Sequence, residues 1–155
     1  MAELQPGDAA PQFTLPKSGG GTLSLADLHG QTVILYFYPK DDTSGCTKEA
    51  CGFRDAHHDI RAEGAVVLGI SPDSVESHDR FAGKYGLPFI LLADTDHRVA
   101  EAYGTWKEKR LYGRHYMGIE RSTFLIDRDG KISQIWRKVK PGGHANEMVS
   151  TLAAG

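Results

Sequence analysis

Two cysteines, Cys46 and Cys51, are the residues of this chain whose type and spacing best suit chemistry. A polar turn (residues 40–44) precedes Cys46, and small or apolar residues then recur at the spacing of one helical face: Cys46, Ala50, Phe53, Ala56 and Ile60. Cys46 is therefore predicted in the first turn of a helix, where unpaired backbone N–H groups and the positive end of the helix dipole favour a thiolate. A thiolate is a nucleophile, which indicates redox or covalent chemistry; a small buried hydrophobe is the alternative.

The spacing of the two cysteines limits what they can do together. Cys46 and Cys51 are five residues apart, so on a continuous helix their Cα atoms would be about 8 to 9 Å apart, beyond the limit of about 7 Å for a disulfide. Either the pair is incidental, or the chemistry includes a step in which the helix unwinds locally. Gly52 would ease unwinding, because glycine inside a helix costs about 1 kcal/mol relative to alanine. The alternative is that Gly52 is a packing contact.

Arg121 is a candidate partner for an anion. It lies in a predicted strand, residues 119–126, where a period of two places it on the same face as Ile119, Thr123 and Leu125. A guanidinium is rarely buried without a partner, so we expect Arg121 to face an anion near a strand end. A solvated edge strand is the alternative.

No metal or cofactor site is predicted. His57 is eleven residues from Cys46, about 16 Å along a helix axis, too far for shared zinc ligation or a hydrogen bond. His57 and His58 are therefore expected to be solvated surface residues. The C-x4-C spacing also differs from the C-x2-C of common zinc sites. Residues 127–130 resemble the start of a calcium loop, but the glycine comes too early and the bidentate glutamate is missing.

The elements that position these residues follow an α/β pattern. Residues 33–38 form a continuous apolar and aromatic run of strand length, which is typical of a strand buried on both faces. Pro39 ends that strand, the cysteine helix follows, and Gly64 ends the helix before a second apolar run at 65–70. A strand, a crossover helix and another strand make a βαβ unit, so the two strands should be parallel.

The rest of the chain adds elements around this unit. A small hairpin is expected where residues 13–15 and 22–25 flank a glycine turn. Asp127-Arg128-Asp129-Gly130 is a hairpin turn signature. Residues 105–117 have no clear period and are predicted to form a long surface loop. The other predicted helices are 75–85, 97–103 and 144–152, and the other strands are 89–93, 119–126 and 131–139; together they favour a single mixed-sheet α/β domain.

Composition and charge exclude several classes of function. The 155 residues, 40% hydrophobic and 25% charged, describe an ordinary globular protein with one sizeable core. The formal net charge of −2 argues against a nucleic acid or an anionic membrane surface as partner. Residues 1–11 lack the features of a signal peptide, and a cytoplasmic location is expected. In that reducing compartment two cysteines are expected to be catalytic, redox-active or inert rather than a structural bridge.

Two overlapping motifs resemble a known family. The segment PKDDTSGC (39–46) resembles the P-x-x-x-T-x-x-C active-site signature of peroxiredoxins. The segment CTKEACGFRD (46–55) is similar more narrowly to the Q-type group, the bacterioferritin comigratory proteins, whose resolving cysteine lies five residues after the peroxidatic one. The resemblance continues through residues 71–74, 87–89 and 118–127 and so covers nearly the whole chain.

The resemblance implies a thioredoxin-like fold, a mixed central sheet flanked by helices, in one domain spanning residues 1–155. It implies a thiol peroxidase that reduces hydrogen peroxide and organic hydroperoxides with electrons from thioredoxin or a similar dithiol, in antioxidant defence, as a monomer and without a cofactor. By this resemblance Cys46 is peroxidatic and Cys51 resolving, Thr43 and Arg121 activate the thiolate and orient the peroxide, and Pro39 shields the sulfur. The Cys46 sulfenic acid would condense with Cys51 to a disulfide.

Two other classes of function remain open from the sequence. A redox sensor or holdase could use the same disulfide switch without turnover. A cysteine hydrolase would need a histidine near the nucleophile, and His29, His115 or His144 could reach Cys46 only through tertiary folding.

Overall fold

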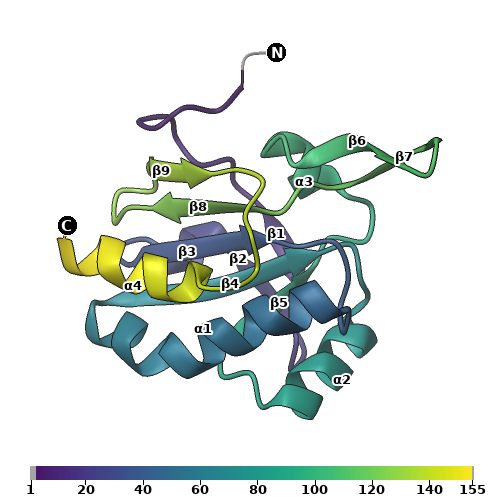
Figure 1. Ribbon diagram of the computed structural model, residues 1–155. Helices are drawn as coiled ribbons and strands as arrows, with labels where there is room; N and C mark the ends of the chain where they lie inside the picture. Colours follow the sequence, from purple (N-terminus) through teal and green to yellow (C-terminus); the bar gives the residue numbers. More distant parts are fainter. Residues whose placement is uncertain (1–2, 155) are drawn as a thin grey trace.

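A five-stranded sheet forms the centre of the computed structural model, which describes residues 3–154 (Figure 1). The strand order is β5 (Ile90–Ala93), β4 (Ala65–Ser71), β3 (Thr32–Phe37), β8 (Ser122–Ile126), β9 (Ile132–Trp136). β3, β4 and β5 are parallel, whereas β8 pairs antiparallel with both β3 and β9. The predicted βαβ unit and the mixed sheet are confirmed.

Strand β3 is the middle strand of the sheet, and it is buried on both faces. Val33, Leu35 and Phe37 lie in one hydrophobic core and Ile34 and Tyr36 in the other. All five are at most 1% exposed. A strand with no solvated face has no polar positions, which explains why its sequence is a continuous apolar run.

Three helices cover one face of the sheet. α1 (Ser44–Ala62) carries both cysteines, α2 (Val75–Tyr85) follows β4, and α4 (His144–Ala154) packs beside α1 (Figure 1). Their buried side chains share a core with Ile34 and Tyr36, and include Phe53, Phe81, Ala145 and Met148. Within residues 3–154, no helix has both the length and the apolar character needed to cross a membrane.

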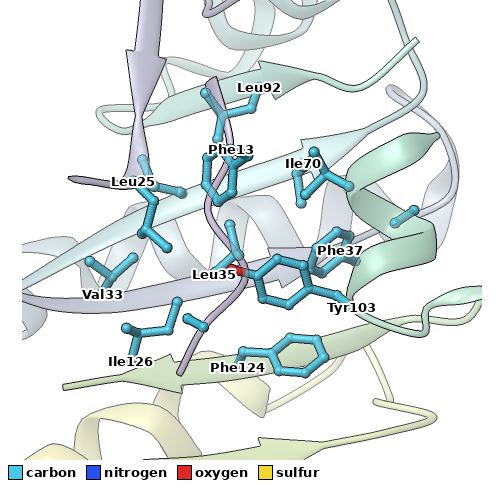
Figure 2. Packing of buried hydrophobic residues seen from close by; sticks show 14 of the residues in the cluster. Phe13, Leu25, Val33, Leu35, Phe37, Ile70, Leu92, Tyr103, Phe124 and Ile126 are labelled. Atoms are coloured by element: carbon cyan, nitrogen blue, oxygen red, sulfur yellow. The ribbon is translucent and has the colours of Figure 1, made fainter. Parts of the chain in front are cut away.

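The other face is covered by the N-terminal segment and the short helix α3 (Arg98–Ala102). The predicted N-terminal hairpin is confirmed as β1 (Thr14–Pro16) paired with β2 (Thr22–Ser24), and a 3-10 helix, η1 (Leu25–Leu28), follows it. Figure 2 shows the aromatic centre of this core, in which Tyr103 contacts three other rings: Phe13, Phe37 and Phe124.

The prediction of a surface loop at residues 105–117 is wrong. The chain forms a second hairpin there, from β6 (Trp106–Leu111) and β7 (Arg114–Ile119), which projects from the body of the protein (Figure 1). Tyr112 and Gly113 form its tip with φ of 50° and 77°. Such a turn is usually marked in the sequence by Asn-Gly or Asp-Gly, and a hairpin whose strand residues are mostly exposed or half-buried lacks alternating apolar positions. Neither sequence signal was therefore present.

The predicted strand at 119–126 is two strands. β7 ends at Ile119 and β8 begins at Ser122, so Arg121 lies in the link between them. Ile119 and Leu125 belong to different cores, which shows that the alternation does not continue across the link. The strand-face argument for Arg121 is wrong, although it does lie at a strand end.

Candidate active site

The position of Cys46 follows from the turn between β3 and α1. α1 begins at Ser44, after Thr43 as its N-cap residue in extended conformation (φ −88°, ψ 158°). The N–H of Thr47 donates to the carbonyl of Thr43 at 2.8 Å. Cys46 therefore lies in the first turn of α1, as predicted, close to backbone N–H groups that have no partner inside the helix.

The sulfur of Cys46 is buried next to a cation. The residue is 1% exposed and lies in the core shared by β3 and α1. Nη2 of Arg121 donates to Sγ of Cys46 at 3.2 Å, and Nη1 of the same guanidinium donates to Oε1 of Glu49 at 2.6 Å. A guanidinium is stable in such a site only when it is paired. Cys46 packs like a small hydrophobe, but its sulfur faces a positive charge.

Arg121 is a fixed cation rather than a solvated surface residue. Its side chain is 14% exposed, so the alternative of a solvated edge strand is wrong. Burial opposes its charge, but the carboxylate of Glu49 and the sulfur of Cys46 outweigh burial and raise the pKa of Arg121 above its ordinary value. The guanidinium therefore stays charged and keeps its two partners in place.

Glu49 is a site residue that the sequence analysis missed. It lies one turn after Cys46, fully buried on the face of α1 that also carries Ala50 and Phe53. Burial raises the pKa of Glu49 to about 7, against the opposing effect of Arg121. Oε2 of Glu49 has no hydrogen-bond partner among the described residues. An acid at i+3 on an otherwise apolar helical face is the signal that could have revealed it.

The loop before α1 is tied to α2 through a buried polar network. The carboxylate of Asp41 accepts hydrogen bonds from the hydroxyls of Tyr38 (2.6 Å) and Ser77 (2.8 Å). It also lies 2.7 Å from Nδ1 of His78, and Nε2 of that histidine lies 2.8 Å from the carbonyl of Leu92. Every polar group in this network has a partner, so Asp41 has a single stable position.

A second set of contacts ties the next residue to the end of α2. The carboxylate of Asp42 accepts hydrogen bonds from Nζ of Lys84 at 2.8 Å and from the hydroxyl of Tyr85 at 2.7 Å. Asp42 has a φ of 58°, a conformation that a non-glycine residue holds only when its surroundings fix it. Asp41 and Asp42 therefore anchor the loop from which α1 starts.

The one group of side chains that could suit a metal ion lies in the same network. Within residues 3–154, only Asp41, Asp73 and His78 bring possible ligand atoms within 4.8 Å of one another. These atoms already bond elsewhere, since Oδ2 of Asp73 accepts from the N–H of Asp41 and from the hydroxyl of Ser71. The cluster is a satisfied hydrogen-bond network, and we assign no metal to it.

The other predicted site residues are close to Cys46 in sequence, and within residues 3–154 none of them forms a hydrogen bond with its sulfur. The hydroxyl of Thr43 donates to the carbonyl of Lys40 at 3.0 Å, and across residues 3–154 it makes no hydrogen bond to Cys46. Pro39 is half-buried at the start of the loop. Cys51 is half-buried further along α1, and both cysteines are free. The structure thus brings Arg121 to Cys46 directly, whereas Cys51 and Thr43 are near neighbours along the chain.

Within residues 3–154, no histidine pairs with Cys46. His144, one candidate, places Nε2 2.8 Å from the hydroxyl of Thr123 and Nδ1 2.9 Å from the carboxylate of Glu147. Burial, assisted by the charge of Arg121 and opposed by Glu147, lowers the pKa of His144. In the described part of the chain no histidine forms a hydrogen bond with Cys46, so the arrangement lacks the base that a cysteine hydrolase requires.

Comparison with known proteins assigns the family. The family model described as the AhpC/TSA family matches residues 6–135. The chain is 57% identical over 149 residues to a putative peroxiredoxin bcp of Coxiella burnetii, covering 96% of this chain and 99% of that protein. It belongs to the AhpC/TSA family and is a peroxiredoxin. Peroxiredoxin Bcp of Bacillus subtilis is 50% identical over 149 residues, covering 96% of this chain and 95% of that protein.

Solved structures of Q-type peroxiredoxins share the fold. A cysteine-to-serine mutant of PrxQ from Xylella fastidiosa has a TM-score of 0.93 and 39% identity, and the match covers 99% of this peroxiredoxin and 98% of that chain. Peroxiredoxin Q of Xanthomonas campestris has a TM-score of 0.87 and 44% identity, covering 92% and 90%. The expected thioredoxin-like fold and the resemblance to the Q-type group are confirmed.

Glu49 should make the stability of this peroxiredoxin depend on pH. Its pKa is about 7 in the folded state against an ordinary value of 4.5, so the folded state binds its proton more tightly than the unfolded chain. As pH rises from about 4.5 to about 7, the unfolded chain loses the proton of Glu49 before the folded protein does. The free energy of unfolding should therefore fall, by on the order of 3 kcal/mol, and level off above this pH range.

The variant Glu49→Gln isolates this effect. Glutamine cannot release a proton, so we expect the stability advantage of wild type over Glu49→Gln to decrease between about pH 4.5 and pH 7. Urea unfolding at several pH values measures it. Glu63→Gln, at an exposed position after the end of α1, is the matched control. If the difference in the free energy of unfolding between wild type and Glu49→Gln stays constant across this pH range, Glu49 does not have the raised pKa assigned to it.

Proposed function

We propose that this peroxiredoxin reduces hydrogen peroxide and organic hydroperoxides through a sulfenic acid on Cys46, which Cys51 resolves as an intramolecular disulfide. The observation that carries the proposal is the guanidinium of Arg121, which donates to Sγ of Cys46 at 3.2 Å. A buried cation beside a cysteine at a helix N-terminus stabilises the thiolate, the form that attacks an O–O bond.

The peroxide step needs few groups. The Cys46 thiolate attacks the terminal oxygen of the hydroperoxide, the O–O bond breaks, and the OH group passes to sulfur. The remaining alkoxide, or hydroxide, takes a proton from water. Arg121 and the free N–H groups of the first turn of α1 are the donors that would stabilise the negative charge as it moves from sulfur to the departing oxygen.

Thr43 would help to position the peroxide, and Pro39 would shield the sulfur. The hydroxyl of Thr43 already donates its proton to the carbonyl of Lys40, so toward a substrate its oxygen can only accept. A hydroperoxide offers one O–H donor, which suits such an acceptor. The half-buried ring of Pro39, at the start of the anchored loop, would limit the access of water to Cys46.

Resolution would require unwinding of the first turns of α1. The sulfenic acid of Cys46 condenses with the thiol of Cys51, forming the disulfide and releasing water. The helix runs without a break through both residues, and a bridge between positions five apart needs a shorter separation than an intact helix allows. Gly52 faces α4, since a Cβ there would meet the Cβ of Ala145 at 3.5 Å, which supports its role as a packing contact.

The reductant, substrate range and setting are parts of the same proposal. A solved relative from Xanthomonas campestris is described in terms of alkyl peroxide reduction, which supports organic hydroperoxides as substrates here. Thioredoxin or a similar dithiol would reduce the disulfide. Free cysteines suit a reducing compartment, and we propose a cytoplasmic, monomeric enzyme with one domain.

Mass spectrometry after one equivalent of hydrogen peroxide tests the proposal. We expect the reduced protein to lose two hydrogen atoms and the peptides of Cys46 and Cys51 to become linked. A persistent gain of one oxygen without linkage would contradict the resolving role of Cys51. Steady-state turnover with thioredoxin and peroxide then distinguishes an enzyme from a redox sensor or holdase, which would oxidise without cycling.

Replacing Cys51 with serine should separate oxidation from recycling. Because Cys46 and Arg121 keep their contact, we expect Cys51→Ser to consume one equivalent of peroxide at the wild-type rate. Turnover with thioredoxin should then stop, since the sulfenic acid has no intramolecular thiol to condense with. Stopped-flow oxidation and a coupled thioredoxin assay measure the two steps. Cycling at the normal rate would show that another thiol resolves the intermediate.

A further inference from the structure

The β6–β7 hairpin carries an unusual concentration of exposed apolar side chains. Within residues 3–154, the exposed large hydrophobic residues are Leu111 (55%), Tyr112 (96%), Tyr116 (46%) and Met117 (49%). All four lie within seven consecutive positions at the end of the hairpin that projects from the body of the protein (Figure 1). Single exposed apolar residues are ordinary, but a cluster of them marks a surface that contacts something else.

Strand pairing separates the hairpin into two faces of different charge. Residues that pair across strands share a face, and residues alternate between faces along each strand. Lys109 pairs with Tyr116 and Leu111 pairs with Arg114. These positions and Lys107 form a surface that we call the Lys109 face: Lys107, Lys109, Leu111, Arg114 and Tyr116. It carries three cations and no acidic residue. The opposite face carries Glu108, Arg110, His115 and Met117.

The hairpin that carries the Lys109 face leads along the chain directly into the candidate active site. β7 ends two residues before Arg121, whose guanidinium contacts Cys46. Lys109 itself is half-buried, and burial together with the charge of Arg121 lowers its pKa, while Cys46 and Glu120 act in the opposite direction. The side chain of Lys109 is therefore within electrostatic reach of both Arg121 and Cys46.

We propose that the Lys109 face is the docking surface for the protein dithiol that reduces the disulfide between Cys46 and Cys51, and that this partner is acidic around its dithiol. The inference rests on the proposed function. Two electrons and two protons pass from the partner, which becomes a disulfide while both cysteines return to thiols. This transfer requires a surface beside the catalytic cysteine.

Charge favours this occupant over a second copy of the chain. Two Lys109 faces brought together would place three cations against three cations, and such like-charge contact is unfavourable. An acidic partner would instead be attracted, and Leu111 and Tyr116 would provide apolar contact beside the cations. The partner's attraction should weaken as salt increases.

Paired variants on the two faces test the proposal. Arg114→Glu and Tyr116→Ser change the Lys109 face, whereas Arg110→Glu and Met117→Ser make the same kinds of change on the opposite face. We measure kcat/KM for thioredoxin, with thioredoxin reductase and NADPH, and in parallel the rate with dithiothreitol. We expect Arg114→Glu and Tyr116→Ser to lower kcat/KM for thioredoxin by about tenfold or more. The opposite-face variants should stay near wild type.

The controls separate docking from chemistry. All four variants should keep the wild-type rate of single oxidation by peroxide and of reduction by dithiothreitol, and Arg114→Glu should weaken the salt dependence seen with thioredoxin. Equal effects from both faces, or no effect from either, would overturn the docking surface while leaving the peroxidase intact. A wild type that cycles with dithiothreitol but not thioredoxin would overturn the proposed reductant and with it this surface.

Two further outcomes would also overturn the proposal. Light scattering could show a dimer that Arg114→Glu or Tyr116→Ser dissociates while thioredoxin kinetics stay unchanged, which would make the face a self-association surface. Sedimentation with anionic phosphatidylserine vesicles could show binding lost in the same variants, again with unchanged kinetics, which would make it a membrane contact.

Discussion

Replacing Cys46 with serine is expected to abolish peroxide consumption. Serine nearly matches cysteine in size, so the buried position should accept it, but its hydroxyl remains protonated and cannot attack an O–O bond at neutral pH. We expect the rate to fall by about four orders of magnitude or more, as when other enzymes lose their nucleophile. Peroxide consumption with dithiothreitol as reductant measures this most simply, because it requires no protein partner.

Two controls make the Cys46→Ser result interpretable. Its thermal unfolding should resemble that of wild type, which shows that the loss is chemical. Cys51→Ser is the matched substitution, since it also replaces a cysteine of α1 but should leave the first oxidation intact. Undiminished turnover by Cys46→Ser would end the assignment of Cys46 as the reacting residue.

Replacing Arg121 is expected to produce the second largest effect on catalysis. Its guanidinium donates to the sulfur of Cys46 and would face the departing oxygen, so Arg121→Ala removes stabilisation of charge at both ends of the reaction. We expect the second-order rate constant for peroxide to fall about 10² to 10³-fold, the usual cost of one such donor. Alkylation of Cys46 by iodoacetamide at neutral pH should slow as well, because the reacting sulfur loses the cation that stabilises its negative charge.

The partner of Arg121 needs its own control. Arg121→Ala leaves Glu49 buried without its cation, which can cost about 3 to 5 kcal/mol of stability when that carboxyl is ionised. The double variant Arg121→Met with Glu49→Gln removes both charges and should recover stability but not the peroxide rate. Arg121→Lys keeps the charge without the two-armed geometry and should give an intermediate rate. Unchanged peroxide kinetics in the alanine variant would remove Arg121 from the site.

Local sequence patterns predicted the fold where each strand or helix has one clear environment. The apolar run at 33–38 specifies a strand buried on both faces, and the βαβ unit around Cys46 follows from it. The β6–β7 hairpin was missed because Tyr112 occupies a turn position at positive φ that asparagine or glycine usually announces. Too few residues of its two strands are buried to produce an alternating apolar pattern in the sequence.

The site was predictable in its chemistry but not in its contacts. Cys46 could be placed at a helix N-terminus because capping and helical spacing are local signals. Arg121 was selected correctly as a residue that needs an anion, yet its contact with Cys46 depends on a link 75 positions away in sequence. Glu49 was overlooked because an acidic residue on a helix is usually solvated, and the partner that compensates its burial, Arg121, lies 72 positions away in sequence.

The anchoring of Asp41 and Asp42 on α2 has a consequence for how the enzyme would move. One end of the segment that carries Cys46 is held by Asp41 and Asp42, and the other is held where Gly52 and Phe53 pack against α4. If α1 unwinds as proposed, these two fixed points would act as hinges and confine the rearrangement to the short stretch between them. In the proposed mechanism Cys46 would then move and Cys51 would stay in place, and the proposed docking face of the hairpin would be the same before and after the disulfide forms.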